Sequence, residues 1–271
     1  MIYPPALSSI VPLDNKKPHN VKVKEWKSVG QLNTPFKGTK GFAPTASMQR
    51  YVFEVDFKQT YLLSTTDINL GNPNIYIVYD FNQWTPSFGN TYPFHNCLFG
   101  STNSKLNGRG IAFDSSGEWT HSDGTTARNV LIFGTDNSKS LSTDNKKVNV
   151  TALGSGSQKF INNQDIEAEA MFKINFTKPD KKFVLSIHYN GNNSYLYVNG
   201  QQIYKFVAQN NPARGESLGL GIISKNFPEK ESKEVALDGK VYEFSIDFRN
   251  RSITDIEHIH SYLIKKHDIS S

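Results

Sequence analysis

The feature of this sequence that most constrains its fold is a two-residue alternation of apolar and polar side chains. In residues 50–58, RYVFEVDFK, aromatic and β-branched residues occupy every second position and acidic residues lie between them. Because successive side chains of a strand point to opposite faces of a sheet, this pattern predicts a half-buried strand. The same pattern recurs in residues 74–81, 128–134, 166–175, 181–190, 194–200, 202–207, 217–223 and 239–248.

Short turn signals separate these runs. The pair Asn199-Gly200 joins two alternating runs and predicts a type I′ hairpin turn, and Asn190-Gly191 is a second pair of this kind. No strand–helix–strand alternation interrupts the series. Many short strands with turn residues between them predict an all-β sandwich or barrel.

The C-terminus departs from this pattern. In residues 252–266 the apolar residues lie three or four positions apart, which predicts one helical stripe. Ser252 followed by Asp255 is similar to a capping box and places the start of the helix there. The stripe consists of Ile253, Ile256, Ile259 and Leu263.

The composition indicates a folded chain, and the sequence pattern predicts one domain preceded by an N-terminal arm. The 271 residues include 18 Phe, 12 Tyr and 3 Trp, enough aromatic residues to exclude a globally disordered chain. Residues 1–45 are rich in Pro, Lys, Asn and Gly and are expected to form an extended arm or a first edge strand. Residues 46–271 are expected to form a single sandwich.

Partners of two classes are not expected. The formal charge of +5 arises from mixed acidic and basic residues, whereas nucleic-acid binding proteins usually gather basic residues on one face. No apolar stretch approaches the roughly 18 residues that cross a bilayer, so membrane insertion is not expected. The start of the chain lacks the pattern of a secretory signal. The location therefore stays open, with the cell exterior or a virion surface expected if the chain is part of a larger protein.

Four segments carry a resemblance to a known superfamily: NIYIVYDF (74–81), CLFG (97–100), KKFVLSIHYNGNNSYLYVNGQQIYKF (181–206) and GKVYEFSIDFRNRSITDIEHIHSYLIKKHDI (239–269). In this order they resemble two early strands, the central hairpin and the closing strand and helix of laminin-G-like domains in the concanavalin A-like lectin and glucanase superfamily. Their residue patterns are also similar to those of uncharacterised, multi-copy animal proteins, some of them associated with mobile elements. The resemblance implies a jelly-roll β-sandwich over residues 50–266.

Some members of this superfamily are glycoside hydrolases, which need two carboxylates at a defined separation. Their usual signature is Glu-x-Asp-x-x-Glu on one strand. The nearest match here is Glu167 and Glu169, which would share a strand face about 6.6–7 Å apart. The third acid is missing, because residues 171 and 172 are Met and Phe. No catalytic residue is therefore expected.

Calcium is an open candidate, because many laminin-G-like and lectin relatives hold it in their loops. Calcium needs six to eight oxygen ligands. The weak candidates are Asp114, Asp123 and Asp136, each beside Ser, Gly or Asn in a turn-like segment. None shows the spacing of an EF-hand, and solvated turn residues are the competing interpretation.

An aromatic segment is the better candidate for ligand binding. Residues 82–95, NQWTPSFGNTYPFH, are long for a connection and hold rings among Asn, Gly and Pro. Rings beside amides suit stacking on a sugar or a peptide. The predicted ligand-binding residues are Trp84, Tyr92 and His95, with Trp119 as a neighbour. The alternative is that these rings turn inward and fill one end of the sandwich.

The expected function is that of a non-catalytic binding or adhesion module, lectin-like in character, with a glycan or a protein as its ligand. One alternative is a structural or receptor-attachment protein, a spike or fibre head, of a virus-like mobile element. A second alternative is a polysaccharide-active glycoside hydrolase. Assembly into a homo-oligomer also stays open, and fold and composition do not decide the ligand.

Overall fold

The computed structural model describes most strands and the C-terminal helix of the chain. The described residues are 2–3, 10–12, 20–28, 34–39, 41–49, 52–68, 71–81, 94–102, 108–120, 126–133, 150–152, 159–161, 164–165, 171–176, 182–206, 217–222 and 236–269. Every strand pairing among them is antiparallel.

One layer of the molecule, the helix-side sheet, has the C-terminal helix on its outer face. Its strands follow the order β5–β6–β20–β8–β16–β17–β18, and β1 adds to β20. The bounds are β1 Ile2–Tyr3, β5 Thr45–Gln49, β6 Val52–Thr60, β8 Asn74–Phe81, β16 Phe183–His188, β17 Ser194–Val198, β18 Gln201–Phe206 and β20 Leu237–Asp247.

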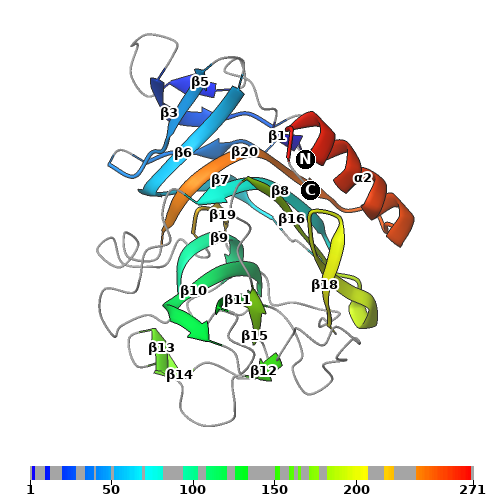
Figure 1. Ribbon diagram of the computed structural model, residues 1–271. Coiled ribbons are helices and arrows are strands. Elements are labelled where there is room, and N and C mark those ends of the chain that lie inside the picture. The colour runs from blue at the N-terminus through cyan, green and yellow to red at the C-terminus, as the bar shows by residue number, and fades with distance from the viewer. Residues whose placement is uncertain are drawn as a thin grey trace.

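The other layer, the opposite sheet, follows the order β2–β3–β4–β7–β19–β9–β10–β11–β15–β12. Figure 1 shows β9, β10, β11 and β15 on the side of the molecule away from the C-terminal helix. The bounds are β2 Ile10–Pro12, β3 Asn20–Trp26, β4 Phe36–Lys37, β7 Leu62–Asp67, β9 Phe94–Thr102, β10 Gly108–Thr120, β11 Thr126–Phe133, β12 Val150–Ala152, β15 Met171–Phe176 and β19 Ser217–Leu220. A separate pair joins β13 Lys159–Ile161 to β14 Gln164–Asp165.

Strand β3 belongs to both layers. Its first residues pair with β5 in the helix-side sheet, and its last residues pair with β2 and β4 in the opposite sheet. Val23 and Trp26 of this strand are fully buried. The chain therefore links the two layers near its N-terminus, and the domain boundary expected between residues 45 and 46 stays a prediction.

The main core fills the space between the sheets. Phe183, Leu185 and Ile187 on β16 all point into it, as their period-two spacing predicts. The opposite sheet contributes apolar residues to the same cluster, among them Phe99. Burial at this interface follows from strands that present one apolar face each, so the prediction of an all-β sandwich with a C-terminal helix is confirmed.

The helix α2, Ile253–Lys266, covers the outer face of the helix-side sheet. Figure 1 shows it beside the ends of β20 and β16. Ser252 caps it, since its hydroxyl accepts from the Asp255 amide at 3.1 Å and the Asp255 carboxylate accepts from the Ser252 amide. This confirms the predicted capping box. A small second core beneath the helix consists of Tyr76, Val78, Val184, Tyr242, Leu263 and Ile269.

The predicted stripe of α2 is wrong at one position. Ile253 is 47% exposed, whereas Ile256, His260 and Leu263 are the buried residues of the helix. The helix therefore presents a histidine to the sheet. Among the described residues, no helix has the length and apolar character needed to cross a membrane.

A bulge in β20 adapts the sheet to the helix. Register with β8 shifts between Val241 and Glu243, so Tyr242 and Glu243 both face α2 while Val241 and Phe244 both enter the main core. A bulge places two consecutive residues opposite one on the partner strand. Without this shift Glu243 would point into the apolar core.

Candidate functional site

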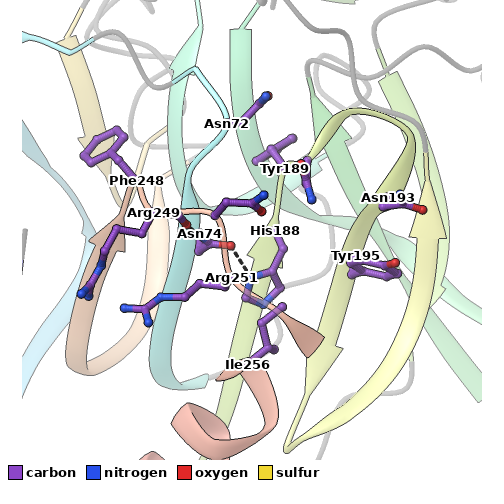
Figure 2. Close-up of a pocket in the computed structure, with 12 residues that line it drawn as sticks. Asn72, Asn74, His188, Tyr189, Asn193, Tyr195, Phe248, Arg249, Arg251 and Ile256 are labelled. Carbon is purple, nitrogen blue, oxygen red and sulfur yellow. Dashed lines mark hydrogen bonds between the residues drawn. The ribbon is translucent and has the colours of Figure 1, made fainter. Parts of the chain in front are cut away.

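A pocket with a volume of about 240 Å³ lies where the first turn of α2 meets the ends of three strands. The strands are β20, β8 and β16, whose ends coincide because Asn74 stands opposite both His188 and Asp247 in register. The segment 248–251, which connects β20 to α2, forms one wall. Figure 2 shows Phe248 and Arg249 on one side of the pocket and Asn193 and Tyr195 on the other.

Asparagine is the most frequent residue in the lining of the pocket. Asn190 precedes the short 3-10 helix Gly191–Asn193 that follows β16, and Asn193 is the last residue of this helix. Each amide side chain offers both donors and acceptors. The five asparagines are Asn72, Asn74, Asn190, Asn193 and Asn250.

Aromatic rings border the same pocket. Tyr195 is partly exposed on β17, and Phe248 is 39% exposed at the end of β20. Tyr189, the third ring, is buried. A pocket with exposed rings and amides can hold a ligand that has both apolar faces and hydroxyl groups.

The charges at the rim compensate one another. The Asp247 carboxylate accepts from Nε of Arg249 at 2.9 Å and from Nε of Arg251 at 2.6 Å. Burial by itself would raise the pKa of Asp247, but the hydrogen bonds from Arg249 and the charge of Arg251 outweigh it and lower that pKa. Asp255 adds a second carboxylate at the start of α2. Two arginines thus face two carboxylates.

Beneath the pocket a chain of buried polar side chains runs from β8 to α2. Nδ1 of His188 lies 2.9 Å from Oδ1 of Asn74, and Nε2 of His188 lies 2.7 Å from Oγ of Ser186. Oγ of Ser186 lies 2.5 Å from Nε2 of His260, whose Nδ1 accepts from the Gly200 amide at 3.0 Å. Ser186 and His260 are fully buried, and His188 is 1% exposed.

The backbone determines which nitrogens in this chain carry protons. The Gly200 amide can only donate, so Nδ1 of His260 must be unprotonated and Nε2 of a neutral His260 carries the proton. That proton goes to Oγ of Ser186, whose own hydroxyl then donates to Nε2 of His188. Nδ1 of His188 is left to donate to Oδ1 of Asn74. Every link is satisfied when both histidines are neutral.

Asn74 ends the chain by holding the pocket wall. Its Nδ2 donates to the carbonyl oxygen of Asp247 at 3.2 Å and to that of Arg249 at 2.6 Å. The oxygen and the nitrogen of this one amide therefore connect the histidine chain to the segment that carries the rim arginines.

Burial keeps both histidines neutral over a wide pH range. Removal from water, with a smaller contribution from the nearby His260, lowers the pKa of His188 to about 3. Burial lowers the pKa of His260 to about 4. The lowered pKa values agree with the neutral state of both histidines that the hydrogen bonds require.

Serine beside histidine also invites comparison with a nucleophile and its base. A nucleophile must contact its substrate, however, and Ser186 is fully buried between the sheet and α2. The hydroxyl is also engaged by both histidines. The arrangement therefore positions the helix and the pocket floor, and the accessible chemistry belongs to the amides and rings above it.

The structure describes none of the side chains predicted to bind a ligand. Trp84 and Tyr92 fall outside the described residues. His95 lies on β9 opposite Phe113, and Trp119 lies on β10 opposite Ala127, with only their backbones described. The pocket at α2 contains none of these four residues.

The metal and catalytic candidates have the same status. Asp123, Asp136, Glu167 and Glu169 lie outside the described residues, and Asp114 is described only as a backbone position on β10. Within the part of the chain whose side chains are described, no group of three or more His, Cys, Asp or Glu residues could hold a metal ion. Calcium therefore stays a prediction.

Sequence reasoning missed the pocket and the histidine chain. The available signals were two polar residues, Ser186 and His188, on a strand whose other residues are apolar, and His260 at helical spacing from Ile256 and Leu263. Polar residues at positions that should be buried indicate a hydrogen-bonded network. The partners of that network, 114 and 74 residues apart in the chain, carry no local signal.

Comparison with known proteins gives distant similarity only. No protein-family model matches the chain, and no curated protein matches its sequence. The receptor-binding domain of botulinum neurotoxin type G is 12% identical with a TM-score of 0.42, over 89% of this chain and 51% of that one. The binding domain of serotype C1 is 13% identical with a TM-score of 0.45, over 89% and 52%.

A third solved structure is domain 4 of AbnA, an extracellular GH43 arabinanase from Geobacillus stearothermophilus, in complex with arabinotriose. It is 11% identical with a TM-score of 0.38, over 93% of this chain and 86% of that one. This chain spans about half the length of the neurotoxin chains it matches. At these TM-scores the similarity bears on neither the ligand nor the activity of this chain.

Proposed function

We propose that this chain is a non-catalytic binding module that holds an uncharged sugar in the pocket at the start of α2. The observation that carries the proposal is the composition of that pocket, in which four asparagines, besides the fully hydrogen-bonded Asn74, surround partly exposed rings. Sugars present hydroxyl groups at the edge of the ring and C–H groups on its faces. Amides suit the hydroxyl groups, and aromatic faces suit the C–H groups.

The size of the pocket supports a small ligand. Its volume of about 240 Å³ is below the ≈ 300–1,000 Å³ of pockets that bury drug-sized molecules. One sugar ring, with neighbouring rings extending into solvent, fits this size better than a buried chain. Phe248 and Tyr195, on opposite sides of the pocket, are placed to contact such a ring (Figure 2).

The charge balance supports an uncharged ligand. Asp247 already engages Arg249 and Arg251, and Asp255 adds a compensating carboxylate nearby. An acidic sugar would have to compete with Asp247 for the guanidinium groups. We therefore expect binding to depend weakly on salt, because salt screens interactions between net charges.

A glycan array that contains neutral and acidic sugars, probed with and without calcium, tests the proposal. We expect binding to neutral glycans that is reduced at least tenfold in Asn193→Ala and Tyr195→Ala. Tyr262→Ala is the matched control, because Tyr262 is an exposed tyrosine on α2 outside the pocket. Equal binding by Tyr195→Ala and Tyr262→Ala would contradict the assignment of the pocket.

The aromatic segment is a second candidate site on the same module. Trp84, Tyr92 and His95, with Trp119, stay the predicted ligand contacts there, and calcium in neighbouring loops stays an expectation. Loss of array binding in Trp84→Ala, with binding retained in Tyr195→Ala, would favour that segment over the pocket.

Three finer predictions from the sequence concern the family, the role and the assembly of the chain. Membership in the laminin-G-like group, attachment to a receptor as a spike or fibre head of a mobile element, and a homo-oligomer are proposals. Light scattering on the purified chain separates two of them, because a stable trimer would favour the fibre-head role over an isolated binding module.

A further inference from the structure

The buried chain beneath the pocket joins two parts of the molecule that must stay together for the pocket to exist. His188 and Asn74 form its floor, and Ile256 on the first turns of α2 forms part of its wall. Between them, His260 links the middle of α2 to the helix-side sheet, because its Nε2 lies 2.5 Å from Oγ of Ser186 and its Nδ1 accepts from the Gly200 amide.

We propose that the hydrogen-bonded side chains Asn74, His188, Ser186 and His260 form a proton-operated latch on the pocket. The latch holds α2 against the helix-side sheet while both histidines are neutral. Proton uptake releases the helix, and the pocket is lost. The proposal deepens the proposed function, on which its consequence for ligand binding rests. The latch itself concerns only the protein and can be tested without a ligand.

A proton added to Nδ1 of His260 has no hydrogen-bond acceptor in the closed structure. Nδ1 of His260 faces the Gly200 amide, and protonation would place two N–H groups 3.0 Å apart with no acceptor between them. The turn at Asn199 and Gly200 cannot easily move away from His260, because Asn199 is hydrogen-bonded to β16. The Val184 amide donates to Oδ1 of Asn199, and the Asn199 amide donates to the Val184 carbonyl, each at 2.9 Å.

A proton on His188 breaks the chain at its centre. With both nitrogens protonated, His188 would donate to Oγ of Ser186, which already accepts from Nε2 of His260. The hydroxyl proton of Ser186 would then lose its acceptor in a fully buried site. A buried donor without a partner is costly.

The surroundings do not compensate for such a charge. Neither histidine has a hydrogen bond or an ion pair to a carboxylate among the described residues. The aromatic neighbours of the two imidazoles are Tyr76 on β8 and Tyr197 on β17. Charged and titratable groups on the surrounding elements include Asp247, Arg249 and Arg251 at the end of β20, and Asp255, Glu257 and His258 on α2. Glu243 on β20 and Lys265 and Lys266 on α2 lie at the far end of the helix.

Release of the helix does not require unfolding of the sandwich. The small core under α2 is separate from the main core between the sheets. The far end of the helix stays tied, because Glu243 accepts from Nζ of Lys266 at 3.0 Å and lies 2.7 Å from Nε2 of His267. The start of α2 can therefore move away from the helix-side sheet while the end of the helix remains bound to Glu243.

The size of the effect follows from proton linkage. If both histidines regain an ordinary pKa near 6.5 in the open form, opening takes up two protons in acid. The ratio of open to closed molecules then rises about 100-fold for each pH unit below 6.5, down to about pH 4. Replacement of one histidine reduces this to about 10-fold per pH unit.

Hydrogen–deuterium exchange of the α2 amides in the full chain, measured between pH 7 and pH 4.5 and corrected for intrinsic exchange, tests the latch. We expect the opening ratio to rise with a slope of two protons in the wild-type chain and of one in His260→Gln. His258→Gln is the matched control, because His258 is exposed on the same helix, and its slope should stay at two. A slope of zero in the wild type, or the same slope in His260→Gln, overturns the proposal.

A second measurement needs no variant and covers the case in which His260→Gln fails to fold. Long-range ¹H–¹⁵N spectra of the imidazoles at pH 6 should show a proton on Nε2 of His260 and on Nδ1 of His188. A doubly protonated His188 or His260 at that pH in the closed form would overturn the latch. Because both readouts are made without sugar, a negative glycan array contradicts the proposed function and leaves these results unaffected.

Discussion

The amide of Gly200, in the tight turn between β17 and β18, donates to Nδ1 of His260 on the C-terminal helix at 3.0 Å. This single contact determines the tautomer of His260, because a backbone N–H cannot accept. The direction of every later hydrogen bond, through Ser186 and His188 to Asn74, follows from it. A turn that the sequence predicts as a simple hairpin thus orders the floor of the pocket.

His260→Ala should destabilise the protein by about 2–4 kcal/mol, because it removes a buried ring and leaves the Gly200 amide and the Ser186 hydroxyl short of a partner. His258→Ala, at an exposed position on the same helix, should change stability by no more than about 0.5 kcal/mol. Urea denaturation at pH 7.5 measures both. Equal effects of the two variants would show that the buried chain contributes little.

The stability of the folded protein should fall as the pH decreases below 6.5. Both histidines have a lowered pKa in the folded state, whereas a histidine in the unfolded chain has a pKa of about 6.5. Below pH 6.5 the unfolded state therefore binds more protons than the folded state. Each histidine then lowers the free energy of unfolding by up to about 1.4 kcal/mol per pH unit, and together they lower it by about 2.7 kcal/mol per pH unit. Urea midpoints at pH 7.5, 6.5, 5.5 and 5.0 test this, and a flat profile would refute it.

Glu243→Gln should destabilise the chain by about 1–3 kcal/mol, because the buried carboxylate accepts from Lys266 and His267 at the end of α2. Burial by itself would raise the pKa of Glu243, but these two hydrogen bonds lower it. The stabilisation is therefore present above the ordinary pKa of a glutamate and is lost in stronger acid. Glu257→Gln, at an exposed position on α2, is the control in urea denaturation at pH 7.

Tyr195 and Tyr197 lie two positions apart on β17 but should respond oppositely to replacement by alanine. Tyr195 is partly exposed in the pocket, so Tyr195→Ala should weaken glycan binding and leave the melting temperature within a few degrees. Tyr197 is 2% exposed and packs against His188, so Tyr197→Ala should cost about 3–5 kcal/mol. Thermal melts and array binding of the two variants decide between these roles.

Trp84→Ala separates the two interpretations of the aromatic segment. An exposed stacking ring predicts weaker binding with an unchanged fold, whereas a ring buried in the sandwich predicts a loss of about 3–5 kcal/mol. Thermal denaturation and array binding of the same sample distinguish them. A collapsed melting temperature with unchanged binding would make Trp84 a core residue.

Local sequence patterns determined several of the strands and the C-terminal helix of this protein. Alternation predicted β6, β8, β16, β17 and β20, because the side-chain period of a strand appears within a few residues. Asn199-Gly200 predicted the hairpin, and both residues adopt the positive φ that a type I′ turn needs, at 47° and 80°. Ser252 and Asp255 predicted the start of α2 for the same local reason.

Only the tertiary structure decided how these elements meet. Strand register and the bulge at Tyr242 and Glu243 depend on partners far away in the sequence, so no local period encodes them. The pocket is a further consequence, because Asn74 lies beside His188 across 114 residues and Ser186 beside His260 across 74 residues. A polar residue in an apolar pattern shows that a buried partner must exist, since an unpaired buried group is costly, but the packing of sheet and helix selects that partner.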